Sequence, residues 1–120
     1  MDKEAKEKRI SKEIARIRGI FKGIESERLK VCSGLIQCAG FMKITLEDYE
    51  IDLDTNGYTE IFRQSENLPE YSKERPVAKL YNVMNKNYQS IIKQLTDLLP
   101  KDAEKEEPDE LVEFLKSRGQ

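Results

Sequence analysis

The chain has 120 residues and a formal net charge of −2, and its hydrophobic and charged residues make up 38% and 37% of the sequence. This length fits one domain, and the small apolar fraction favours helices that share cores between subunits. Histidine is absent, which removes Ser-His and Cys-His nucleophiles and the usual zinc ligands. We therefore expect a self-associating protein that is not an enzyme and has no cofactor.

The sequence has no stretch of about 18 apolar residues and no signal peptide, so a cytoplasmic location is expected. Cys32 and Cys38 lie six positions apart in one predicted helix, about 240° apart around its axis. They cannot form a disulfide within that helix, and reduced, buried thiols are the expectation for both.

Charge is distributed unevenly along the chain. Residues 1–22 carry a net charge of +4, residues 23–99 carry −3, and residues 100–120 carry −3. A basic start and an acidic end suggest two different partners, although two solubilising ends explain this charge pattern equally well.

The first predicted element is an amphipathic helix in residues 1–24. Its apolar positions recur every three or four residues, at Ile10, Ile14, Ile17, Phe21 and Ile24. Four basic residues share an arc of about 100° that lies away from this stripe and is free of acids. These candidate DNA-binding residues are Lys8, Arg9, Lys12 and Arg16. A basic helix face of this kind is a solvent-exposed surface without a binding role as often as it is a nucleic-acid site. Gly19 and Gly23 predict a bend or stop near residues 22–25.

A central helical hairpin is predicted for residues 25–100. The first long helix runs from about Glu25 to Leu53, and its apolar arc of about 160° is wide enough for more than one neighbour. Gly34 and Gly40 would let a partner backbone approach it closely. Residues 54–75 are rich in turn-forming residues, and their apolar positions show no helical periodicity. We therefore expect a loop. A second helix begins at Pro76 and ends at Pro100.

Two helices of similar length joined by a loop predict an antiparallel pair that oligomerises through its apolar faces. The predicted oligomer interface consists of Val31, Leu35, Ala39, Met42, Leu46, Tyr81, Met84 and Tyr88. Tyr49, Tyr81 and Tyr88 could stack on bases, but their helical spacing with Leu and Ile favours packing in a core.

The last segment, residues 101–120, begins with a charged tether. A short amphipathic helix is predicted after it, with apolar residues at Leu111, Val112, Phe114 and Leu115. Such a peptide suits docking into the groove of a partner, and the alternative is a terminal helix folded back on its own domain.

One stretch resembles a calcium-binding loop. Residues 52–60 match its first nine positions, with oxygen donors at positions one, three and five and a glycine at position six. Arg63 stands where the bidentate Glu should be. We therefore expect a helix end with an acidic turn and no metal site, and we keep a calcium sensor as a second alternative function.

Several short segments together resemble a known family. They are residues 34–42, 50–57, 76–84 and 88–101, the last of which contains Lys-Gln-Leu-Thr-Asp-Leu-Leu-Pro-Lys at 93–101. In this order and at these lengths the chain resembles, over roughly residues 10–101, the small terminase subunits of tailed phages and prophages of Gram-positive bacteria.

The resemblance implies a non-catalytic, ring-forming factor for viral genome packaging in the host bacterial cytoplasm. Such a factor recognises concatemeric phage double-stranded DNA and recruits or regulates the terminase large subunit, which holds the ATPase and nuclease. The sequence lacks the clear helix-turn-helix that some small terminase subunits carry. DNA contact is therefore expected mainly through phosphates and shape.

We thus expect an all-α protein with three parts. Residues 1–24 form the basic helix, residues 25–100 the oligomerising hairpin, and residues 101–120 the tether and the segment that docks the large subunit. The alternative function is a helical protein-interaction adaptor without DNA binding.

Overall fold

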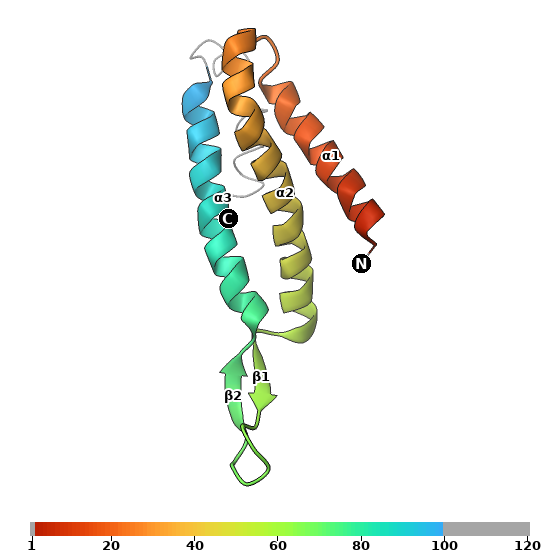
Figure 1. Ribbon diagram of the computed structural model, residues 1–120, viewed down its shortest axis with the longest axis vertical. Helices are drawn as coiled ribbons and strands as arrows, with labels where there is room; N and C mark the ends of the chain where they lie inside the picture. Colours follow the sequence, from red (N-terminus) through yellow and green to blue (C-terminus); the bar gives the residue numbers. More distant parts are fainter. Residues whose placement is uncertain (1, 100–120) are drawn as a thin grey trace.

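The computed structural model describes residues 2–99 as three helices and one two-stranded hairpin (Figure 1). The elements are α1 (Lys3–Ile20), α2 (Ser26–Asn56), β1 (Thr59–Phe62), β2 (Tyr71–Glu74) and α3 (Pro76–Leu98). In Figure 1, α2 lies between α1 and α3, and it packs on both of them. Consecutive helices run in opposite directions, so the predicted antiparallel pair of long helices is confirmed as α2 and α3.

The helix ends follow from local sequence signals. The side chain of Asp2 accepts a hydrogen bond from the backbone N–H of Glu4 and caps the start of α1. The turn after α1 contains Gly23 in the left-handed region, at φ 89°, which confirms the predicted stop. At the other end of α2, the backbone N–H of Gly57, at φ 83°, donates to the carbonyl of Leu53.

The expected loop of residues 54–75 contains an antiparallel hairpin, so the all-α prediction is wrong at this place. β1 and β2 pair in a register that puts Phe62 opposite Tyr71. Their rings meet edge to face with centroids 5.5 Å apart, and the ammonium of Lys73 lies 4.2 Å from the Phe62 centroid. These cross-strand contacts hold a short hairpin that projects beyond the helices (Figure 1).

Arg75 joins the base of this hairpin to the end of α2. Its guanidinium donates to both carboxylate oxygens of Asp52, at 3.0 and 3.2 Å, and to the carbonyl oxygen of Gly57 at 2.7 Å. The Asn56 amide and the Arg75 guanidinium hold the pKa of Asp52 below its ordinary value, because both donate to the charged carboxylate. The charged carboxylate of Asp52 therefore has a structural role, because it binds the Arg75 guanidinium.

This contact bears on the calcium-sensor alternative. The first five positions of the calcium-like pattern, residues 52–56, lie within α2 and do not form a loop. Helical backbone does not converge their oxygen donors on one ion in the way a calcium loop does. Among residues 2–99, no group of three or more His, Cys, Asp or Glu side chains is placed to hold a metal ion.

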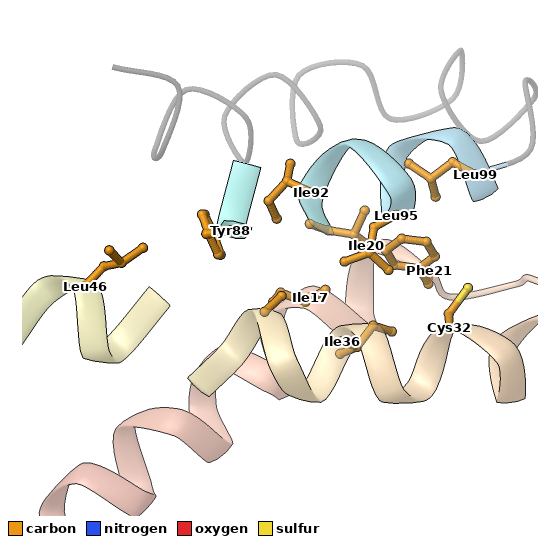
Figure 2. Close-up of a cluster of buried hydrophobic side chains, with 11 residues drawn as sticks. Ile17, Ile20, Phe21, Cys32, Ile36, Leu46, Tyr88, Ile92, Leu95 and Leu99 are labelled. Carbon is orange, nitrogen blue, oxygen red and sulfur yellow. The ribbon is translucent and has the colours of Figure 1, made fainter. Parts of the chain in front are cut away.

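The core lies where all three helices meet. Figure 2 shows Ile17, Ile20 and Phe21 from α1 and its C-terminal turn facing side chains of α2 and α3. The buried residues of the other two helices and their ends are Cys32, Ile36, Ala39, Leu46, Tyr88, Ile92, Leu95 and Leu99. The wide apolar arc of α2 is thus used within one chain, by α1 on one side and α3 on the other. By length and composition α2 could also cross a membrane, a property it shares with core helices of soluble proteins.

Gly40 allows α1 to approach α2 closely. A Cβ atom at this position would lie 2.5 Å from Cγ1 of Ile14, well inside van der Waals contact. The close approach predicted for Gly40 therefore occurs with α1 of the same chain. Gly34 has no neighbouring heavy atom within 4 Å of such a Cβ, so no close approach explains the second glycine.

Replacing Gly40 by Ala should destabilise the protein by about 1 kcal/mol. Overpacking against Ile14 costs about 1–3 kcal/mol, whereas the gain in helix propensity is only about 1 kcal/mol. Gly34→Ala is the matched control and should stabilise by up to about 1 kcal/mol, because its Cβ enters open space. Urea unfolding measures both values. A Gly40→Ala protein as stable as Gly34→Ala would contradict the close contact.

Candidate nucleic-acid and subunit surfaces

Arg9 lies across the interface between α1 and α2. Its Nη1 donates to Oδ1 of Asp48 at 2.7 Å, and its Nη2 donates to Oε1 of Glu47 at 3.0 Å. These hydrogen bonds raise the pKa of Arg9 above its ordinary value. Lys6 adds a longer ion pair to Asp48 at 3.7 Å. The prediction that Arg9 belongs to an acid-free, outward face is therefore wrong, because two carboxylates of α2 hold its guanidinium.

Arg16 also has a partner, on its own helix. Its guanidinium donates to both carboxylate oxygens of Glu13, at 3.0 and 2.7 Å. Glu13 is buried, and Nζ of Lys43 lies 3.5 Å from the same carboxylate. A buried carboxylate needs such cations, because its loss of hydration is otherwise unfavourable. Arg16 thus helps to neutralise Glu13, which lies beside the predicted acid-free arc, and its assignment to DNA binding stays a prediction.

Lys8 and Lys12 keep the position that the sequence predicts. Both are exposed on the side of α1 that faces away from α2, and neither forms an ion pair within residues 2–99. Of the four predicted DNA-binding residues, these two therefore have ammonium groups available to a phosphate.

A second basic row, on α3, escaped the sequence analysis. Lys79, Lys86 and Lys93 follow one another at intervals of seven residues, so they lie within about 40° of one another around the helix. All three are exposed, and within the described part of the chain none of them forms an ion pair. The seven-residue interval is visible in the sequence and could have revealed this row.

The residues of the predicted oligomer interface divide into three groups by burial. Ala39, Leu46 and Tyr88 are fully buried inside the single chain, so in this arrangement they cannot contact a second copy. Val31 is 69% exposed and stands away from the core. The remaining residues are half-buried, namely Leu35, Met42, Tyr81 and Met84.

An apolar groove runs beside this surface, between α2 and α3. Its walls include Cys38, Phe41 and Met42 from α2, and Met84 and Ile91 from α3. Cys38 is exposed, which corrects the prediction of two buried thiols, whereas Cys32 lies in the core and burial raises its pKa. The sequence analysis expected Cys38 to be buried and therefore did not identify the groove.

The predicted docking residues for a large subunit, Leu111, Val112, Phe114 and Leu115, lie outside the described residues. The chain matches no protein-family model, and it shows no significant similarity to any curated protein or solved structure compared with it.

Replacing Arg9 by Glu should lower stability by about 1–2 kcal/mol. The change removes a pair of charge-assisted hydrogen bonds and places a third carboxylate beside Glu47 and Asp48, and each effect is worth up to about 1 kcal/mol on a partly exposed surface. Lys8→Glu, which makes the same charge change one residue away, should alter stability by less than about 0.5 kcal/mol. Thermal unfolding at low ionic strength measures both, and equal losses would show that Arg9 does not hold the two helices together.

Proposed function

We propose that this chain is a non-catalytic viral DNA-packaging subunit of the small-terminase type. In this proposal it self-assembles, contacts double-stranded DNA through exposed lysines, and recruits a large subunit that carries the ATPase and nuclease. The observation that carries the proposal is the exposure of two lysine rows, one on α1 and one on α3, that form no ion pair within residues 2–99. The order and length of the segments that resemble small terminase subunits support it.

The two lysine rows suit a binding mode that reads phosphates and does not read bases. Lys8 and Lys12 present ammonium groups on α1, and Lys79, Lys86 and Lys93 present them on α3. Lysine binds phosphate as a point charge and imposes no base preference. Within one chain these rows offer few contacts, but a symmetric assembly would repeat them, and affinity for a polyanion grows with the number of phosphates neutralised.

Self-assembly is supported by apolar surface that the three helices leave exposed. Val31 on α2 is exposed, and Leu35, one turn further along the same helix, is half-buried against the core. Exposed apolar residues of this kind are buried when a second copy packs on them. A closed ring of copies is one arrangement that this surface would allow.

Replacing each lysine row by Gln should weaken DNA binding and reduce its salt dependence. Each lysine that neutralises a phosphate contributes about 0.9 to the slope of log affinity against log salt, so Lys8→Gln with Lys12→Gln should remove about 1.8 per chain engaged. The triple change on α3, at Lys79, Lys86 and Lys93, should remove about 2.7 by the same rule. Fluorescence anisotropy with a duplex at several salt concentrations measures the slope.

The matched control replaces two other exposed lysines, Lys22 and Lys30, by Gln and should leave the slope unchanged. Binding by both row variants that equals the control would show that these rows are only solvated. If the parent chain binds no duplex even at low salt, the adaptor without DNA binding becomes the better proposal.

Val31→Asp should dissociate the assembly and leave the helices folded. The residue is exposed in the single chain, so the new carboxylate is hydrated in the monomer and would lose that hydration only in an interface. Ile61→Asp on β1 is the matched control because Ile61 has the same exposed fraction, 69%. Light scattering gives the mass and circular dichroism the helix content. A parent chain of monomer mass, or an assembly that survives Val31→Asp, would contradict the proposed interface.

A further inference from the structure

The groove between α2 and α3 opens away from the contact of α1 with Gly40, and the Lys6 ammonium of α1 reaches its edge, 5.2 Å from the Phe41 ring centroid. Cys38 in the groove and Gly40 under α1 are two positions apart, which places them about 200° apart around the helix. Phe41 is 47% exposed there, and thioether and aliphatic side chains of Met42, Met84 and Ile91 complete the walls. A concave surface with these residues suits an apolar occupant of about one or two helical turns.

The same chain carries a segment of matching size. Leu111, Val112, Phe114 and Leu115 place four apolar side chains in five residues, and charged residues flank them on both sides. A short amphipathic helix in a hydrophobic groove is a recurring mode of peptide recognition, and Met-rich walls adapt well to such a ligand.

The distances along the chain allow this segment to reach the groove. Ile91 and Met84 lie seven and fourteen residues before the end of α3 at Leu98, which corresponds to about 11 and 21 Å along the helix. Twelve residues lie between Leu98 and Leu111, and a random coil of that length would have an r.m.s. span of about 20 Å. A linker whose span matches the distance gives an effective concentration near the millimolar range.

We propose that the segment Leu111–Leu115 docks into the groove between α2 and α3 of its own chain. Docking within one chain avoids the loss of translational freedom that a second copy would incur at micromolar concentration. Met42 and Met84 belong both to this groove and to the predicted oligomer interface, so the docked segment covers part of that interface. The inference goes beyond DNA binding and does not depend on it.

The two cysteines provide the test within the full chain. Cys38 lines the groove and Cys32 is buried in the core, where burial raises its pKa and slows its reaction. Alkylation of the full chain by iodoacetamide, read at each cysteine by mass spectrometry, should be at least threefold faster at Cys38 in a Phe114→Ser, Leu115→Ser variant. Cys32 should react slowly in both proteins and reports that the core is intact.

The matched control is Glu113→Ser with Lys116→Ser, which changes polar residues of the same segment and should leave Cys38 protected. A synthetic peptide of residues 105–120 should restore the protection of the Phe114→Ser, Leu115→Ser variant at high micromolar concentration. Equal Cys38 rates in the parent and this variant, or a failure of the peptide to protect, would overturn the proposal.

Repeating the parent reaction at 1 and 50 micromolar protein separates this proposal from self-assembly. Docking within one chain predicts the same protection at both concentrations. Protection that grows with concentration and persists in the Phe114→Ser, Leu115→Ser variant would show instead that a second copy covers the groove, and would overturn the proposal while supporting assembly.

Discussion

The structure depends on the contact that α2 makes with two neighbours at once. One face of α2 receives α1, and the face toward α3 contributes Ala39 and Leu46 to the core. Most of the stability of a helix in a protein comes from tertiary packing, and α2 has apolar burial on both sides. Gly40 sets how closely α1 approaches, and the core positions of Ile17 and Phe21 depend on that approach.

Polar contacts then determine how the elements are aligned, which apolar burial alone does not specify. Arg9 aligns the start of α1 with the later turns of α2, and Arg75 fixes where the hairpin leaves the helices. Both arginines use a planar guanidinium to join two or more acceptors, which an ammonium group does with less directional preference. Arg9 and Arg75 therefore hold separate elements together, whereas the lysine rows of α1 and α3 face solvent.

Much of the fold could be predicted from the sequence, because helical periodicity is a local property. The stripe from Ile10 to Ile24 and the apolar arcs after Glu25 and Pro76 gave helices with bounds within a few residues of those observed. The hairpin was not predicted. Asn56 and Gly57 indicate a turn, and the β-prone stretches Thr59–Phe62 and Tyr71–Glu74 are each only four residues long.

The surfaces were predicted less well, because their partners come from distant positions. The carboxylates that bind Arg9 stand 38 and 39 residues away along the chain, which no pattern within one helix can show. Arg16 is different, since Glu13 lies only three residues before it and spacing alone could have identified the pair. Whether an apolar residue of α2 faces the core or solvent depended on where α3 crosses it, so Ala39 was buried and Val31 was not.

The two halves of α1 are held by different forces, and this has a consequence for how the helix responds to ionic strength. Its C-terminal half is anchored by the apolar side chains of Ile17 and Ile20. Ahead of Ile14, α1 contacts α2 through the ion pairs of Lys6, Arg9 and Glu13 and through the Lys6 ammonium beside the Phe41 ring. Added salt screens charges at the surface, first at longer contacts such as the one at 3.7 Å, and leaves apolar burial intact. High ionic strength should therefore weaken the contact between α2 and the first turns of α1 more than the contact that Ile17 and Ile20 make.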